Sequence, residues 1–93
     1  MLGTEVLEKA KRLHRDLAAP VATWLAVARE ARWRSLNELR HTWRNTDRVK
    51  ARTVFNIKGN KYRLIAIVNY ESQTILLKSL LTHAEYDKED WNK

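Results

Sequence analysis

Apolar residues recur every three or four positions through the first half of the chain, which predicts helices. The first stripe consists of Val6, Ala10, Leu13 and Leu17. Thr4 is the expected N-cap of this helix, and Pro20 either ends it or opens the next helix in its first turn. A second apolar face follows within residues 21–31. The sequence Ser35-Leu36-Asn37-Glu38 has the form of a capping box and predicts a short third helix.

The helical period ends near residue 44, and strand-forming segments follow. Residues 44–52 combine turn-forming side chains with several arginines and lysines, so they predict a basic loop. The segments 53–57, 62–70 and 74–81 are rich in β-branched and aromatic residues and predict three strands. Helices followed by strands indicate an α+β fold, with the helices on one face of a small antiparallel sheet.

A turn at Gly59-Asn60 sets the pairing of the first two strands. With a two-residue loop, Ile57 lies opposite Tyr62, and opposed residues share a face of the sheet. One face is then almost wholly apolar and is expected to pack on the helices. The other face has an apolar floor and carries a group of cationic and amide side chains at the hairpin end: Asn56, Lys58, Lys61 and Arg63.

The register of the third strand depends on the turn before it. A two-residue turn at Ser72-Gln73 puts Lys78 and Thr82 on the polar face, with Thr82 opposite Arg63. A three-residue turn fits the sequence equally well, and a one-residue slip would swap every side chain. The sequence Thr82-His83-Ala84-Glu85 is a second capping-box pattern, so a helical turn is expected to aim Tyr86 and Asp87 toward the polar group.

Composition adds a size limit and a charge. The 93 residues suffice for a single domain, 1–93, and 18 Lys and Arg against 11 Asp and Glu give a net charge of +7. Such an excess attracts nucleic acid or an acidic partner protein, although a charge that serves solubility alone would look the same. The chain lacks cysteine, a bilayer-spanning apolar run and a secretory leader, so we expect a cytoplasmic protein that does not bind membranes.

Two blocks of the chain resemble the HigB family of toxins from type II toxin–antitoxin systems, within the RelE/ParE-like superfamily. Residues 54–65 read VFNIKGNKYRLI, and residues 82–88 read THAEYDK and are followed by Asp90-Trp91. Trp24 and Trp33 also stand where these toxins commonly have tryptophans. The resemblance implies a RelE-like fold, with two to three N-terminal helices on a sheet of about three strands. These toxins usually begin with a short strand, for which Met1-Leu2-Gly3 is very short.

The resemblance also implies an activity and partners. Toxins of this family inhibit translation by cleaving messenger RNA, usually in the decoding site of the small ribosomal subunit. A HigA-like helix-turn-helix antitoxin is the implied protein partner. We expect no cofactor and no metal, because RNA cleavage can use the substrate's own 2′-hydroxyl as the nucleophile.

Several residues are candidates for this chemistry. The expected catalytic residues are Lys58, Arg63, His83 and Tyr86. The expected RNA-binding residues are Arg48, Arg52, Asn56, Lys61 and Lys78. Asp87 is expected to orient His83 or to contact the antitoxin. Each has an ordinary alternative: lysines beside a turn are commonly solvated, and a histidine at a strand end is commonly a cap. Arg63 is harder to explain structurally, because its strand is otherwise apolar.

Two other functions fit the same composition. A basic module could block translation by binding RNA or the ribosome without cleaving it. A ParE-like toxin of the same broad fold could instead poison gyrase. Other enzyme classes find little support, because two glycines cannot build a phosphate-binding loop and no paired-histidine metal motif is present.

Overall fold

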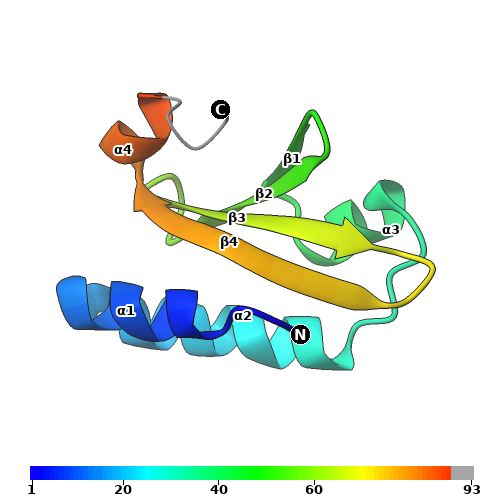
Figure 1. Ribbon diagram of the computed structural model, residues 1–93, viewed down its shortest axis with the longest axis horizontal. Helices are drawn as coiled ribbons and strands as arrows, with labels where there is room; N and C mark the ends of the chain where they lie inside the picture. Colours follow the sequence, from blue (N-terminus) through cyan, green and yellow to red (C-terminus); the bar gives the residue numbers. More distant parts are fainter. Residues whose placement is uncertain (89–93) are drawn as a thin grey trace.

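The computed structural model describes residues 1–88, in which helices cover one face of an antiparallel sheet (Figure 1). The elements, in chain order, are α1 (Glu5–Leu13), the 3-10 turn η1 (Arg15–Leu17), α2 (Ala18–Glu30), α3 (Leu36–Thr42), β1 (Thr46–Val49), β2 (Arg52–Ile57), β3 (Tyr62–Asn69), β4 (Thr74–Thr82) and α4 (His83–Asp87). The α+β class is confirmed. Asp90 and Trp91, which contributed to the resemblance, lie outside the described residues.

The sheet has four strands in the order β1-β2-β3-β4, where the sequence predicted about three. The prediction of a basic loop over 44–52 was wrong, because Thr46–Val49 pairs with β2. Contacts with the residues just before this segment also hold it in place: the Arg40 guanidinium donates to the Thr46 carbonyl at 2.9 Å, and the Thr46 hydroxyl donates to the Trp43 carbonyl at 2.6 Å. Three of the four residues of β1 are polar, so the composition of this segment resembles that of a loop.

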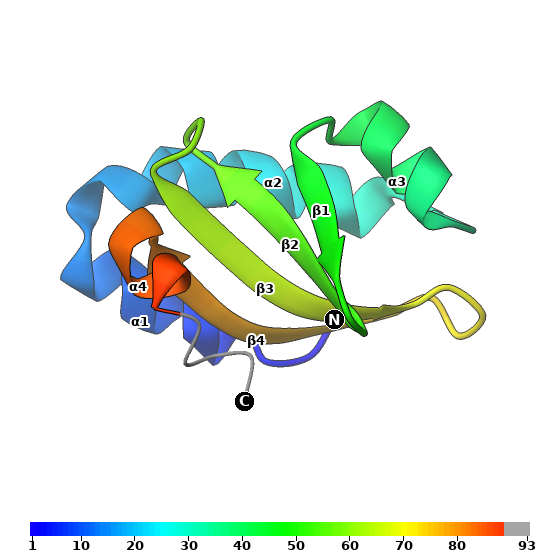
Figure 2. The same cartoon turned by 90° about the horizontal axis from the view of Figure 1, so that it is seen from above.

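The main core lies between the sheet and the helices that run beneath it (Figures 1 and 2). Phe55 of β2 is fully buried there, with its ring 5.1 Å from that of Trp24 and 6.2 Å from that of Trp33. Leu64 and Ala66 of β3 extend the same buried surface. The face predicted to be apolar is therefore the one that the helices cover.

The first helix is shorter than its apolar stripe suggested. The chain becomes extended at His14, so Leu17 belongs to η1 and is buried there, while Leu13 is 68% exposed. Leu7 replaces Leu13 as the buried leucine of α1. Pro20 lies in the first turn of α2, which is the second of the two positions expected for it.

The N-terminal residues pair with β4 through a single parallel bridge. The Leu2 amide donates to the Ile75 carbonyl at 2.8 Å, and the Leu77 amide donates to the Leu2 carbonyl at 2.8 Å. Gly3 follows with φ of +81°, and a Cβ at this position would lie 2.4 Å from the Leu77 carbonyl oxygen. The short first strand implied by the resemblance is thus reduced here to one bridge.

The register between β3 and β4 differs from the expected one. Arg63 lies opposite Leu81, and Thr82 lies opposite Tyr62 on the helix-covered face. The placement of Thr82 opposite Arg63 was wrong, because residues 70–73 separate the strands and the register shifts near Lys78. Lys78 has no partner in β3. Between residues 1 and 88, each helix is too short or too polar to cross a bilayer.

The aromatic contacts around Phe55 are predicted to contribute strongly to stability. Replacing Phe55 by Leu keeps an apolar side chain but removes both ring contacts, so it should lower the unfolding free energy by about 1–2 kcal/mol. Ile67→Val, at a 37% exposed position on the other face, should change it by less than about 0.5 kcal/mol. Urea denaturation measures both values, and equal losses would contradict this account of the core.

Candidate functional site

The loop between β2 and β3 carries side chains that point to both faces of the sheet. Lys58 and Gly59 adopt positive φ angles of 54° and 66°, and the Lys61 amide donates to the Lys58 carbonyl at 3.2 Å. Ile57 lies opposite Tyr62, as predicted from the turn. The hairpin therefore sends Tyr62 toward the helices and Arg63 to the opposite, open face.

On the open face, Arg63 is attached to the hairpin loop. Its Nη1 donates to the Asn60 carbonyl at 2.8 Å. Asn56, which lies opposite Arg63, donates from its side-chain amide to the Asn60 side chain at 3.4 Å. The Asn56 Oδ1 is buried and has no hydrogen-bond partner within the described residues. Arg63 and Asn56 thus form a polar group beside the loop, and they are two of the four residues that the sequence predicted there.

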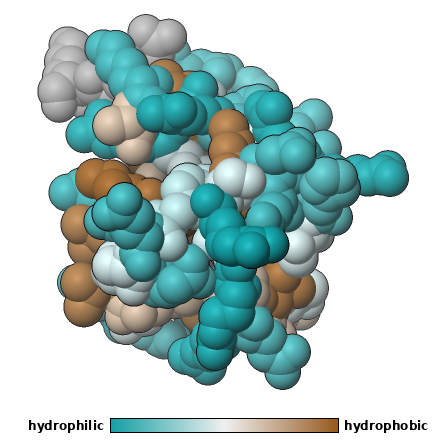
Figure 3. Space-filling model, turned by 90° about the vertical axis from the view of Figure 1, so that its right-hand side faces the viewer, coloured by the Kyte–Doolittle hydropathy of each residue, from teal (hydrophilic) through white to brown (hydrophobic). Residues whose placement is uncertain are grey.

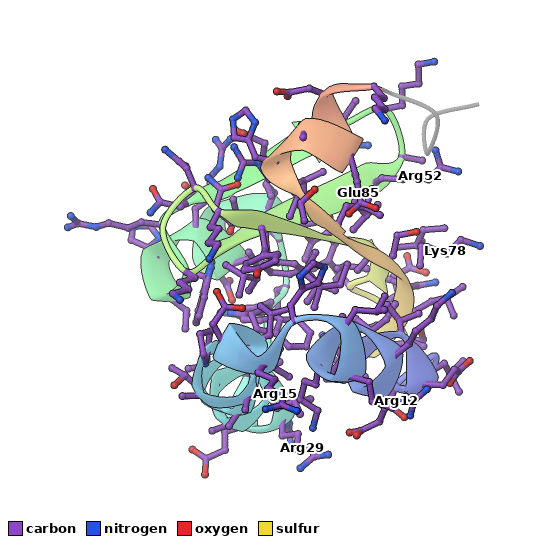
Figure 4. All side chains as sticks on the ribbon, turned by 90° about the vertical axis from the view of Figure 1, so that its left-hand side faces the viewer. Arg12, Arg15, Arg29, Arg52, Lys78 and Glu85 are labelled. Atoms are coloured by element: carbon purple, nitrogen blue, oxygen red, sulfur yellow. The ribbon has the colours of Figure 1, made fainter. Side chains whose placement is uncertain are left out.

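Helix α4 is anchored at the same end of the sheet (Figure 4). The capping box expected at its start is formed: the Thr82 hydroxyl accepts from the Glu85 amide at 3.2 Å, and the Glu85 carboxylate accepts from the Thr82 amide at 2.9 Å. The bond from the Thr82 amide lowers the pKa of Glu85. The His83 amide donates to the Lys61 carbonyl at 3.0 Å, so α4 is attached to the chain just before β3.

These attachments bring α4 side chains to Arg63. The Arg63 guanidinium lies 5.4 Å from the centre of the Tyr86 ring, within the range of a cation–π contact. His83 Nδ1 lies 2.7 Å from the Asp87 carboxylate, with the histidine side chain 52% exposed. Arg63, Tyr86 and the His83–Asp87 pair therefore share one end of the sheet.

The two hairpin lysines contact a different residue. Lys58 Nζ lies 2.9 Å and Lys61 Nζ 2.7 Å from the same Asp16 oxygen, Oδ2. The Tyr62 hydroxyl donates to the other oxygen of Asp16 at 2.8 Å. Asp16 belongs to η1, on the helix-covered side of the sheet. The lysines thus lie near Arg63 in sequence, but their ammonium groups are held by a carboxylate from the helical layer.

This cluster shifts the pKa values of its members. Hydrogen bonds from Lys61, Lys58 and Tyr62 hold the pKa of Asp16 well below its ordinary value of 3.8. The bond to Asp16 raises the pKa of Lys61 above 10.5. Burial, followed by the bond to Asp16, raises the pKa of Tyr62. Asp16 is consequently a carboxylate and Lys61 a cation at neutral pH.

The remaining predicted RNA-binding residues are more scattered. Arg52 and Asn56 are four residues apart on β2, so both belong to the open face. Arg48 lies opposite Thr53 and faces the other way. Lys78 points outward from β4 (Figure 4). It lines a hollow between β4 and α1, together with Val6 and Lys9 of α1. The two-residue turn that was expected to put Lys78 on the polar face is not formed, because Asn69 pairs with Thr74 and Lys78 has no partner in β3.

Sequence reasoning missed Asp16 and the polar role of Tyr62. Asp16 lies outside the apolar stripe that predicted the first helix, and Tyr62 lies on the face predicted to be apolar. Tyr62 is indeed 2% exposed, but its hydroxyl reaches the carboxylate. Asp16 lies 42 positions before Lys58, so no local pattern links the two.

Larger hollows lie away from this end of the sheet. One of about 440 Å³ is lined by residues such as Ala28, Trp33 and Ile75, and a neighbouring one shares Trp33. Figure 3 shows the molecule from the side of α3 and the β3–β4 loop, with apolar side chains among hydrophilic ones. Among residues 1–88, no three His, Asp or Glu side chains lie close enough together to hold a metal ion.

Most of this chain is similar to proteins of a known family. The family model for HigB toxin, described as the RelE-like toxic component of a toxin–antitoxin system, matches residues 17–89. The mRNA interferase HigB of Escherichia coli O6:H1 is 30% identical over 84 residues, which cover 87% of this chain and 82% of that protein. The mRNA interferase toxin HigB of Escherichia coli K12 is 47% identical over 34 residues, 37% of this chain and 33% of that protein.

The Asp16 cluster predicts a pH-dependent contribution to stability. Because folding lowers the pKa of Asp16, its contribution is present above about pH 4 and is lost as the pH falls toward the folded-state value. Asp16→Asn should therefore be less stable than the wild type at pH 5–7, and the gap should narrow below pH 4. Urea unfolding at several pH values measures it.

A control for this prediction is Glu8→Gln, which removes a carboxylate paired with Lys11 at 2.9 Å on the exposed side of α1. The Glu8 side chain is 60% exposed, so its loss should change stability little. A gap for Asp16→Asn that stays constant from pH 7 to pH 3 would contradict the assigned pKa shift.

Proposed function

The chain belongs to the HigB family of RelE-like toxins, and from this premise we propose that it is an endoribonuclease that cleaves messenger RNA. The proposal is supported by the relative from Escherichia coli O6:H1, which is an mRNA interferase. It is also supported by the net charge of +7, which suits a polyanionic substrate. The open face beside α4 is the proposed active site.

The proposed reaction uses the RNA itself as nucleophile. The 2′-oxygen attacks the adjacent phosphorus, the bond from phosphorus to the 5′-oxygen breaks, and a cyclic phosphate remains on the upstream fragment. A base must accept the 2′-hydroxyl proton, and an acid must donate a proton to the departing 5′-oxygen. The enzyme must also stabilise the negative charge that builds up on the phosphate. No metal or cofactor takes part in this scheme.

Arg63 is assigned to the phosphate. A guanidinium presents several donors in a fixed plane, and Arg63 uses one nitrogen on the Asn60 carbonyl while its carbon lies over the Tyr86 ring. His83 is assigned a proton-transfer role, since it is half-exposed and its Nδ1 is held by Asp87 at 2.7 Å. Asp87 would then orient the ring. The meeting of Arg63 with Tyr86 beside this pair is the observation that supports the site most directly.

Other residues have supporting roles in the proposal. Tyr86 either donates the second proton or stacks on an unpaired base. Lys58 stabilises charge on the reacting phosphate, while Asn56, Lys61 and Arg52 bind the neighbouring backbone. Arg48 and Lys78 lie farther from this group, so their contacts would be with more distant phosphates.

We further propose that cleavage occurs on the ribosome, in the decoding site of the small subunit, and that it inhibits translation. Family membership implies an antitoxin, and a HigA-like helix-turn-helix protein is the proposed one. The protein is proposed to act in the cytoplasm, where messages are translated.

Substitutions at the proposed site should abolish cleavage while binding remains. Arg63→Ala and His83→Ala are each expected to slow message cleavage by about 10²–10⁴-fold, because each removes charge stabilisation or proton transfer from the transition state. Primer extension on ribosome-bound message measures the cuts, and co-sedimentation measures ribosome binding. Arg12→Ala is the control, since it removes the same charge from the exposed side of α1.

Several outcomes would contradict the proposal. Variants of Arg63 and His83 that cleave as fast as the wild type would contradict the assigned site. Growth inhibition without message cuts, and with ribosome binding retained, would favour a binding module that blocks translation. DNA breaks with intact messages would indicate a gyrase poison.

Binding to the ribosome should weaken steeply with salt, because cationic side chains release counterions when they contact phosphates. Arg52→Ala is expected to reduce the slope of log affinity against log salt by about 0.7–0.9, the value of one phosphate contact. Arg12→Ala should leave the slope unchanged. Equal slopes for the wild type and Arg52→Ala would remove Arg52 from the binding surface.

A further inference from the structure

The two hairpin lysines are held around a single carboxylate before any RNA is bound. Both ammonium groups contact Oδ2 of Asp16, at 2.9 Å for Lys58 and 2.7 Å for Lys61. The lysine side chains remain 43% and 58% exposed, respectively, and that of Asp16 is 30% exposed. An ammonium has three donors, so each lysine keeps donors for a second anion. The cluster is therefore closed on one side and open to solvent on the other.

The carboxylate is itself fixed in orientation. Its other oxygen accepts from the hydroxyl of Tyr62, which is 2% exposed in the core face of β3. The loop is held from the opposite face as well, because Arg63 donates to the Asn60 carbonyl. Asp16 thus connects the helical layer to the hairpin tip, and the tip carries both the lysines and the attachment of Arg63.

Charge sets what this arrangement can do. One carboxylate against two ammonium groups leaves one positive charge at the tip. A phosphate arriving there must share the lysines with Asp16, which weakens its binding. However, the two ammonium groups already lie side by side, so the lysine side chains lose less rotational freedom when they bind the phosphate.

We propose that Asp16 is a positioning residue of the RNA-binding hairpin, which aligns Lys58 and Lys61 for an RNA phosphate while reducing their affinity for it. This inference rests on the proposed function and adds a residue to it. Asp16 precedes the region that the family model matches, residues 17–89. The lowered pKa of Asp16 supports the proposal, because the carboxylate stays charged at every pH at which RNA cleavage would be assayed.

The test is Asp16→Asn, which keeps the shape of the side chain and removes its charge. The variant should bind a single-stranded RNA oligonucleotide about 2–5-fold more tightly, with a salt slope steeper by about 0.7 for each lysine released. Its maximal rate of single-turnover cleavage on ribosome-bound message should fall about tenfold, because the lysines are no longer aligned. Binding and cleavage should therefore change in opposite directions.

Two controls separate the local effect from a general one. Glu8→Gln raises the net charge by the same unit and releases Lys11 on α1, so it should change neither the salt slope nor the maximal rate. In a chain that already carries Lys58→Ala and Lys61→Ala, Asp16→Asn should have no further effect on RNA affinity. Asp16→Glu, which restores the charge, should bring RNA affinity back toward the wild-type value.

Other outcomes would overturn the inference. If Asp16→Asn binds RNA more weakly and also cleaves more slowly, Asp16 contributes only to the stability of the fold. If the variant binds RNA more tightly and cleaves at an unchanged rate, Asp16 only competes with RNA for the lysines and does not position them. In both cases a wild-type chain that cuts its message leaves the proposed function intact. A wild-type chain that cuts no message overturns the proposed function and the positioning role together, whatever Asp16→Asn does to RNA affinity.

Discussion

The register of the β2–β3 hairpin is the constraint on which both the core and the proposed site depend. Ile57 opposite Tyr62 places Phe55 under the helices and Asn56 with Arg63 on the open face. Because side chains alternate along a strand, a slip of one residue between β2 and β3 would either bury the arginine or expose the phenylalanine. The tryptophans that enclose Phe55 therefore also determine, through the hairpin, where the Arg63 guanidinium lies.

Local signals were enough to predict this hairpin and the start of α4. The Gly59-Asn60 turn and the alternation beside it lie within a dozen residues, and the capping box at Thr82 lies within four. The β1 strand has three polar residues among its four, and the β3–β4 register depends on an irregularity near Lys78. Neither feature produces a periodic pattern of apolar residues in the sequence, so the predicted strand count and the predicted pairing of Thr82 were wrong.

The contacts of the candidate site also divide into those that local sequence predicts and those that it does not. Arg63 and Tyr86 could be predicted to meet, because Arg63 is the second residue of β3, which pairs with β4, and Tyr86 follows the end of β4. The partner of Lys58 and Lys61 could not, because Asp16 comes from a turn between two helices. Only the packing of that turn against the buried face of Tyr62 brings its carboxylate to the hairpin tip.

The result is an unequal distribution of charge around one loop. The hairpin lysines share a carboxylate, so part of their attraction for an anion is already used. Arg63 has a backbone carbonyl and an aromatic ring as neighbours, and it forms no ion pair with residues 1–88. Neutral neighbours orient a guanidinium without reducing its net charge. A phosphate at this end of the sheet would therefore be attracted most strongly to Arg63. The lysines beside Arg63 are already oriented, and they would attract the phosphate less strongly.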